Sequence, residues 1–474
     1  MKKIKDFICC KLPSESFYKY EYITMFLSLF CMMFYYVLIF VFREKEIFPD
    51  FTWQLYPFFI ILYVPLIHSL IYHIKNKDFK IKPLEIFFIF YLFFCVNATI
   101  FADNKVNSLF GENARNEGLF TIIMYILIYL LGRNIVNKEN VFKLINMLFA
   151  FGIVNVIVGL FQSFTTWHAY FDEMAYGFAS NPNMFGLLIG MLATIAVCLY
   201  LSNIESIKKY KKYYLFCSIF FYIGLLLAES AGPFFTFVGM LFIISIYYLI
   251  KKVSLKKIVI LFIIFIILFP IIQFSNRAVN EYYLKDVEQT IGSNNDYAKL
   301  YSDVKRIINI ILPKKDNENE LNYEIEKNTI SENASNETNK SEIKNDEKNT
   351  LTNGRLAEWR EVIFKILMNH ENGVGLDCLN MYIYQRGFLE ILDKAHNQYL
   401  DICVSIGILG CFIYLSIMFI IFIKGLTNKN PIAKVLFFGF LYYSIAIFVN
   451  ISVPFSAMYY YIVIGLLIGI CEKE

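Results

Sequence analysis

Apolar segments about as long as a bilayer is thick recur along this chain, and they constrain its fold more than any other feature. A membrane-spanning helix needs about 20 mostly apolar residues, because the hydrocarbon core is ~30 Å thick. Lipid offers no partner to backbone N–H and C=O groups, so these segments are expected to be helices. The twelve expected spans are residues 23–42, 55–74, 83–101, 118–136, 143–164, 184–201, 213–228, 233–250, 256–272, 399–423, 433–449 and 455–471. The sequence therefore predicts an all-α membrane protein with about twelve transmembrane helices.

Composition and charge agree with this fold class. Apolar residues make up 57% of the chain and charged residues only 18%, well below the roughly 25% of charged residues in soluble domains. The formal net charge of +4 comes mainly from short basic loops between apolar segments. These loops form no basic face that could follow a phosphate backbone, so membrane lipid is an expected partner and nucleic acid is not.

The distribution of basic residues predicts the orientation of the chain in the membrane. The amino-terminal segment is basic and has neither an apolar core nor a small-residue cleavage site before residue 23, so the first helix is expected to remain as an anchor. More than half of the 44 Lys and Arg residues lie in segments expected inside, and few lie in the short external ones. We therefore expect a multi-pass protein of the cytoplasmic (inner) membrane, with both termini cytoplasmic and the active site extracytoplasmic.

The longest interruption of the apolar pattern divides the chain into three parts. Residues 1–272 are expected to form a bundle of nine helices, 273–396 a large extracytoplasmic loop between helices 9 and 10, and 397–474 a bundle of three helices. Residues 313–352 contain too few apolar side chains to bury a core, which predicts a disordered insert. Residues 355–368 carry apolar side chains at three-to-four spacing, which predicts an amphipathic helix on the membrane or on the bundle.

The cysteines predict neither a metal site nor a disulfide framework. Cys378 alone lies in an expected external loop, whereas Cys403 and Cys411 lie in an apolar span. The chain also has no Asp-x-Asp element and no His-x-x-x-His pair. We therefore expect no metal ion and no cofactor.

Polar residues at the outward ends of several segments could converge on a lipid headgroup. An arginine suits a diphosphate because its planar fork gives bidentate, charge-assisted hydrogen bonds, and an imidazole exchanges protons near neutral pH. Each residue type also has a structural role: an arginine can snorkel, an asparagine can cap a helix, a serine can fill a turn, and a histidine at a helix start is more often structural. The candidates are Arg115, Glu117, Asn181, Asn183, Glu229, Ser230, Arg355, Trp359, His396 and Asn397.

The order of these residues resembles that of the O-antigen ligase/polymerase family of bacterial polyprenyl-diphosphate-dependent membrane glycosyltransferases. The elements that carry the resemblance are Arg-x-x-Gly-Leu at 115–119, Asn-Pro-Asn at 181–183, Gly-Arg at 354–355 with Trp359 four residues after the arginine, Gly-x-Gly at 373–375, and His-Asn at 396–397 before a membrane helix. One departure is the Glu-Ser-Ala-Gly sequence at 229–232, where the family usually has Ser-Arg-Gly. An arginine that is commonly present in the family is therefore missing here.

The resemblance implies a metal-independent glycan transfer on the outer face, from a polyprenyl-diphosphate-linked glycan donor to a saccharide acceptor. Arg355 and Arg115 would stabilise the departing diphosphate, and His396 would orient or deprotonate the acceptor hydroxyl. Asn397 would hold the imidazole or a sugar hydroxyl, and Trp359 would stack on a sugar ring or anchor the interface. The other residues expected to bind substrate are Asn181, Asn183, Glu117 and Ser230.

Three alternatives stay open at this point. Within the family, a polymerase is preferred because heavy use of Lys, Asn, Ile and Phe suggests an AT-rich genome, and a cell without an outer membrane has no lipopolysaccharide core; a ligase that uses a lipid or protein acceptor is the alternative. A transporter or flippase of polysaccharide or lipid-linked sugar is the rival from another class, although no internal repeat or mid-membrane charge is evident. A non-catalytic scaffold is the third. For a polymerase, a separate flippase and a chain-length regulator are candidate partners.

Overall fold

The computed structural model describes most of the chain outside the long loop. The described residues are 14–43, 56–76, 81–112, 115–136, 138–164, 174–179, 181–290, 355–368, 372–385 and 388–473. The segment 313–352, expected to be a disordered insert, lies outside them. Residues 1–277 and 354–474 form one compact unit, and residues 278–353 form a second, of which 278–290 are described.

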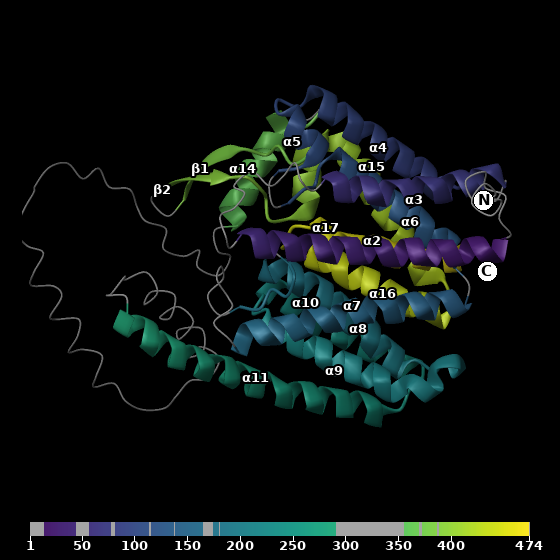
Figure 1. Cartoon of the computed structure of the whole chain (residues 1–474), viewed down its shortest axis with the longest axis vertical. Coiled ribbons are helices and arrows are strands. Elements are labelled where there is room, and N and C mark those ends of the chain that lie inside the picture. The colour runs from purple at the N-terminus through teal and green to yellow at the C-terminus, as the bar shows by residue number, and fades with distance from the viewer. Residues whose placement is uncertain are drawn as a thin grey trace, which may run out of the picture. The chain divides into compact units, whose positions relative to one another are not determined.

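Helices make up almost all of the described chain (Figure 1). Several begin where the sequence favours a helix start: the side chains of Asn181 and Asn430 accept hydrogen bonds from backbone N–H groups, and Pro182 and Pro431 occupy the first turn, where a missing N–H costs nothing. The helices are α2 (Ser14–Arg43), α3 (Tyr56–Lys75), α4 (Pro83–Phe101), α5 (Lys105–Phe110), α6 (Leu119–Asn134), α7 (Lys138–Phe164), α8 (Pro182–Leu201), η2 (Glu205–Tyr210), α9 (Lys211–Leu227), α10 (Ala231–Ile250), α11 (Leu255–Thr290), α14 (Arg355–Met368), α15 (Gln398–Thr427), α16 (Pro431–Ala446) and α17 (Pro454–Lys473).

Each apolar range expected to span the membrane overlaps one of these helices. Among the described residues, seven helices have the length and apolar composition needed to cross a membrane, and they lie in α4, α7, α8, α10, α11, α15 and α17. Helices α6 and α16 are apolar but shorter. The multi-pass helical membrane fold is therefore confirmed, and the full set of twelve crossings stays a prediction.

A two-stranded hairpin departs from the predicted all-α fold. Strands β1 (Met381–Gln385) and β2 (Phe388–Leu392) pair antiparallel, with Tyr382 opposite Ile391. Both strands are rich in aromatic and aliphatic residues, which favour extended structure, but neither is long enough to stand out within a loop. The helix expected at 355–368 is confirmed as α14.

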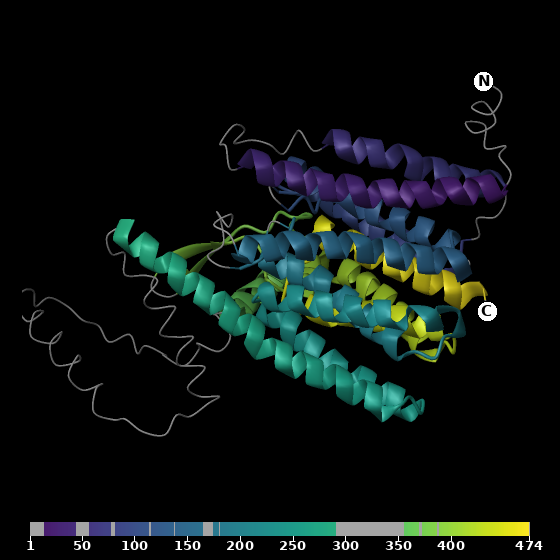
Figure 2. The ribbon, with the colours of Figure 1, turned by 60° about the horizontal axis from the view of Figure 1, so that its bottom comes forward.

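The core of the larger unit surrounds α8, whose residues are all buried except Asn183, and α17, which is almost entirely buried. Helices α9, α10 and α16 pack on α8, α6 packs on α17, and α4 packs on α15. Short elements collect at one end of this bundle: α5, α14, β1 and β2 lie opposite the end where the chain terminates (Figures 1 and 2). That end contains every connection that carries a candidate residue.

Two glycines let α6 and α17 approach closely. A Cβ atom at Gly465 would lie 2.5 Å from the carbonyl oxygen of Tyr129, and one at Gly132 would lie 3.4 Å from the Cα of Gly465. Membrane helices that lack a hydrophobic driving force between them commonly associate through such small residues. The contact between α6 and α17 therefore depends on the absence of side chains here.

We expect Gly465→Val to destabilise the bundle, because its side chain would overlap the backbone of α6. Overpacking of this kind costs about 1–3 kcal/mol, or more where backbone is met. The thermal midpoint of the purified protein in detergent measures the effect. Gly239→Val is the matched control, since nothing lies within 4 Å of a Cβ at Gly239; equal midpoints for the two variants would contradict the close approach.

Candidate functional site

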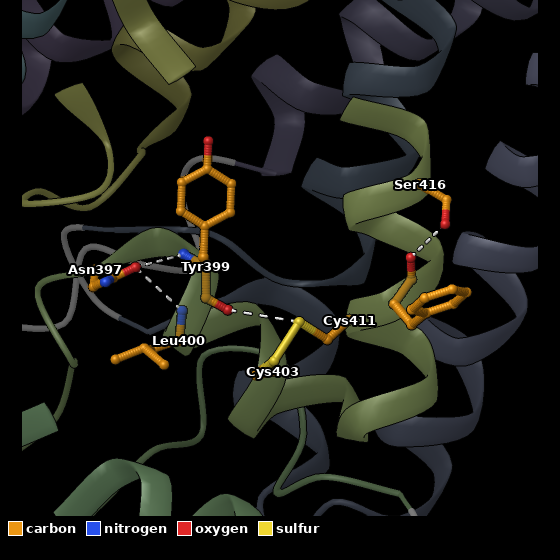
Figure 3. The surroundings of a disulfide bond; sticks show 7 residues. Asn397, Tyr399, Leu400, Cys403, Cys411 and Ser416 are labelled. Carbon is orange, nitrogen blue, oxygen red and sulfur yellow. Dashed lines mark hydrogen bonds between the residues drawn. A yellow bond between two sulfur atoms is a disulfide. The ribbon is translucent and has the colours of Figure 1, made fainter. Parts of the chain in front are cut away.

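Helix α15 is broken near its start, and the break shapes the candidate site. Gly407 has φ 78° and ψ 170°, which is not helical, and a disulfide joins Cys403 to Cys411 across the break (Figure 3). Their Cα atoms are 4.8 Å apart, whereas residues eight apart in an unbroken helix lie ~12 Å apart. The chain therefore turns sharply at Gly407, between a short first segment and a longer second one.

The disulfide corrects the sequence analysis, which expected no disulfide framework and a single uninterrupted span at 399–423. Both cysteines were assigned to the apolar interior of that span, where residues eight apart cannot meet. Gly407 is the residue that makes the meeting possible, because its positive φ is open to glycine at little cost.

The glycine-rich turn at 373–375 packs against this break. The N–H groups of Val374 and Gly375 donate to the carbonyl oxygens of Val404 and Ser405 at 2.9 and 3.0 Å. Gly373 and Gly375 both have positive φ, and a Cβ at Gly373 would lie 2.3 Å from the Ser405 oxygen. The turn therefore supplies donors to carbonyl groups of the broken helix, and side chains at its glycines would prevent the approach.

Asp377, two residues further on, joins three segments that are distant in sequence. Its buried carboxylate accepts a hydrogen bond from the N–H of Glu112 at 2.7 Å and pairs with the ammonium of Lys394 at 2.9 Å. The guanidinium of Arg115 lies 3.9 Å from the same carboxylate and also pairs with Asp393. Asp377 thus brings together the loop at 111–118 that carries Arg115 (the Arg115 loop) and the turn at 393–397 that carries His396 (the His396 turn).

Charge and burial set the protonation states in this network. Burial alone would raise the pKa of Asp377, but the Lys394 ammonium, the Glu112 N–H and the Arg115 guanidinium together outweigh burial and hold that pKa below its usual value. Burial alone would lower the pKa of Lys394, and the Asp377 carboxylate raises it instead. Both groups are therefore charged at neutral pH and form a buried ion pair.

Glu117 behaves differently, although it belongs to the same loop as Arg115. Burial raises the pKa of its carboxyl to about 8, and the opposing effect of Lys394 is too small to prevent this. Asp377 and Asp401 add to the increase because their negative charges disfavour a third. The carboxyl of Glu117 is mostly protonated at neutral pH.

His396 lies at the start of α15 with its backbone in the left-handed region at φ 50°. Its Nδ1 atom is 3.5 Å from a carboxylate oxygen of Glu358, and its side chain is about half exposed, at 45%. The indole N–H of Trp359 donates to the carbonyl oxygen of Ala395 at 2.8 Å, so α14 holds the residue before His396. Asn397 caps α15 by accepting from the N–H groups of Tyr399 and Leu400 (Figure 3).

A second group of candidates lies where α8 and α10 begin. The side chain of Asn181 accepts from the N–H of Asn183 at 2.8 Å, so its expected capping role is confirmed. Ser230 donates to the side chain of Asn183 at 2.5 Å. A Cβ at Gly232 would lie 2.6 Å from the amide nitrogen of Asn450, and the Asn450 carbonyl accepts from the N–H of Gln398. This second group is therefore connected to the start of α15 through Asn450.

Other candidates are only partly described. Arg355 is the first residue of α14, but its side chain lies outside the described residues, so its expected role stays a prediction. Among the residues that the structure describes, no group of three or more His, Cys, Asp or Glu side chains could hold a metal ion.

Asp377 and Lys394 were not predicted as site residues from the sequence. The available signals were their positions, two residues after Gly-x-Gly and two before His-Asn, but position alone does not show that an acid and a base will meet.

These features define a polytopic helical membrane protein that brings an arginine loop and a histidine turn together at one end of its bundle. Residues 215–415 match the family model Wzy_C, described as O-antigen ligase. The match runs from α9 into α15 and indicates an O-antigen ligase/polymerase-type activity, the transfer of glycan at a membrane. It contains Ser230, Trp359, His396 and Asn397, whereas Arg115 lies outside it. The comparison with curated proteins found no match for the chain.

We expect Glu117→Gln to remove a pH dependence of folding stability. Because the pKa of Glu117 is raised on folding, the folded state retains a proton that the unfolded state releases; its contribution is fully present below the ordinary pKa of 4.5 and is lost as the pH rises through about 8. The thermal midpoint of the unaltered protein should therefore fall more steeply over this range than that of the variant. Fluorimetry in detergent across a pH series measures both, with the exposed Glu205→Gln as control. Parallel curves for the unaltered protein and Glu117→Gln would argue against a neutral buried carboxyl.

Proposed function

We propose that this protein is an outer-face glycan polymerase, which joins polyprenyl-diphosphate-linked oligosaccharide repeat units of a surface polysaccharide. The observation that carries the proposal is the family match over residues 215–415, because it contains the His396 turn to which Asp377 ties the Arg115 loop. A leaving-group cation and a proton acceptor are the two parts that this transfer requires.

The proton acceptor in this mechanism is His396. The hydroxyl of the acceptor saccharide attacks the anomeric carbon of the donor, its proton passes to the imidazole, and the bond between that carbon and the diphosphate oxygen breaks. The Glu358 carboxylate, which faces Nδ1, would orient the ring and stabilise the imidazolium that forms. Asn397 caps α15 and Trp359 holds Ala395, so both support the position of the histidine.

The lipid diphosphate leaves with its negative charge stabilised by Arg355 and Arg115. Arg115 already pairs with Asp393 and lies near Asp377, so a diphosphate would share this guanidinium with carboxylates. Asp393 is partly exposed, at 41%, and is the partner that a bound phosphate could displace. Glu117, Asn181, Asn183 and Ser230 complete the proposed substrate-binding set.

The proposed orientation places the site outside and both termini in the cytoplasm, with all twelve segments crossing the inner membrane. Support comes from the end of the bundle opposite the site, where Glu472 pairs with Lys82 at 2.8 Å, Arg133 at 2.7 Å and Lys424 at 3.4 Å. Basic residues are favoured on the cytoplasmic side. The proposed activity needs neither a metal ion nor a cofactor.

A ligase is the second candidate, and the match to a family described as O-antigen ligase favours it. A ligase would use the same donor and the same leaving group, but its acceptor would be a lipid or a protein. The two activities differ in their product: a polymerase extends lipid-linked chains, and a ligase moves finished glycan to another molecule. A flippase and a chain-length regulator are the proposed partners of a polymerase.

We expect His396→Ala to abolish long glycan chains while single repeat units accumulate. Loss of a general base slows transfer by about 10²–10⁴-fold. The length distribution of lipid-linked and surface glycan measures this, with the amount of variant in the membrane determined in parallel. Lys208→Ala, on the exposed surface of η2, is the control and should leave chain length unchanged. Unchanged chain length in His396→Ala would refute the catalytic role, and full-length lipid-linked chains that fail to reach their acceptor would favour the ligase.

A further inference from the structure

Asp377 is the buried charged residue on which three connections of the outer end converge. Its side chain has no exposed surface and that of Lys394 is 6% exposed. One carboxylate oxygen receives the N–H of Glu112, and the other faces Lys394 and Arg115. The donors therefore come from the connection between α5 and α6 and from the connection between β2 and α15.

The segment that carries Asp377 has little freedom to move. Asp377 itself has φ 52°, a left-handed conformation that is uncommon for a non-glycine residue. The preceding turn is bound to the broken part of α15, and the N–H of Leu376 donates to the hydroxyl of Ser108 at 3.0 Å. A carboxylate held this firmly fixes the positions of the cations that pair with it.

The two cations that face Asp377, Lys394 and Arg115, lie in the segments that carry the proposed proton acceptor and the proposed leaving-group cation. Lys394 is two residues before His396, and the residue between them is held by Asp401, which accepts from the Ala395 N–H at 2.8 Å. Arg115 lies in a loop closed by Gly111 and Gly118, where a Cβ at Gly118 would lie 2.3 Å from the Gly111 nitrogen. Arg115 also pairs directly with Asp393, but that carboxylate is partly exposed, whereas Asp377 is buried. A shift of Asp377 would therefore change the separation of the arginine from the histidine as far as the exposed pair yields.

We propose that Asp377 is a positioning residue. It contacts Glu112 and Arg115 on one side and Lys394 on the other, and this set of contacts, called the clasp below, joins the Arg115 loop to the His396 turn. The clasp sets the distance between the leaving group and the proton acceptor. This inference rests on the proposed function for its catalytic consequence, but the clasp itself is a structural claim. Misplacement of reacting groups by about 1 Å can lower a rate by ~10²-fold.

The ion pair also offers a way to separate positioning from stability. Asp377→Asn leaves Lys394 buried without its nearest counter-charge, which is strongly destabilising. Lys394→Met leaves Asp377 with only the more distant Arg115 and should be destabilising as well. The double variant Asp377→Asn/Lys394→Met removes both charges and should recover the thermal midpoint. It still lacks the clasp, so its kcat should stay ~10²-fold below that of the unaltered protein, with little change in KM for the donor.

A second readout does not depend on activity. The thiol of Cys378, next to Asp377, is partly buried and lies 3.3 Å from the carbonyl oxygen of Asn104, and burial together with the Asp377 charge raises its pKa to about 12, so it should react slowly with a maleimide. Lys394→Met keeps the Asp377 charge and removes a cation that lowers the thiol pKa, so labelling that is at least ~10-fold faster in this variant and in the double variant would report opening of the clasp and not a change of charge. Cys378→Ser gives the background, and Glu205→Gln is the control for loss of an exposed acid.

The experiment uses the full chain in membranes, a membrane-impermeant maleimide, and lipid-linked repeat unit extracted from the same cells as donor. Faster Cys378 labelling together with an unrecovered kcat in the double variant supports the clasp. Recovery of both the thermal midpoint and kcat in the double variant would show that Asp377 is merely structural and overturn the proposal. Absence of transfer by the unaltered protein would refute the proposed function, and equal labelling rates in unaltered protein and Lys394→Met would overturn the clasp independently.

Discussion

Backbone groups that lose their helical partners in apolar surroundings must find new ones, and this requirement organises the end of the bundle that carries the candidate site. The break at Gly407 interrupts the hydrogen-bond ladder of α15, and the carbonyl groups of Val404 and Ser405 accept from the glycine-rich turn. Because that turn is fixed on the broken helix, the residues that follow it are fixed as well. The placement of Asp377, and through it of Arg115, follows from the hydrogen bonds between this turn and the broken helix.

Charged residues hold each end of the bundle, and they do so in different ways. At the end away from the site, Glu472 on α17 pairs with three basic residues from other parts of the chain. At the site, the Asp377–Lys394 pair is buried and joins connections rather than helices. Buried pairs often contribute little net stability, because desolvation offsets their attraction, and their value here lies in the single geometry that they permit.

The sequence was sufficient to predict features that recur along the chain, such as apolar segments. It was insufficient to predict contacts between residues that are brought together by the fold. Apolar segments located the helices, three-to-four spacing located α14, and the candidate Asn181 caps a helix as expected. The disulfide was missed because a span of the right length was taken to be continuous, although Gly407 interrupts it. The hairpin β1–β2 was missed because its strands are short.

The site shows the same division between local and distant signals. His396 and Trp359 were picked out by local motifs, and the structure places α14 against the turn before His396. Asp377 and Lys394 are separated by 17 positions in the sequence and carry no motif of their own. Their pairing depends on the packing of three connections, which is information that no single stretch of sequence contains.

The bond between Cys403 and Cys411 makes the shape of α15 depend on chemistry that follows synthesis. Thiols are kept reduced in the cytosol and are oxidised in compartments outside it, so the bond fits the outward orientation expected from the basic loops. Until it forms, only the backbone at Gly407 joins the first segment of α15 to the second. Completion of the site would then be a maturation step, and the number of finished molecules in a membrane would depend on the supply of oxidant as well as on the rate of translation.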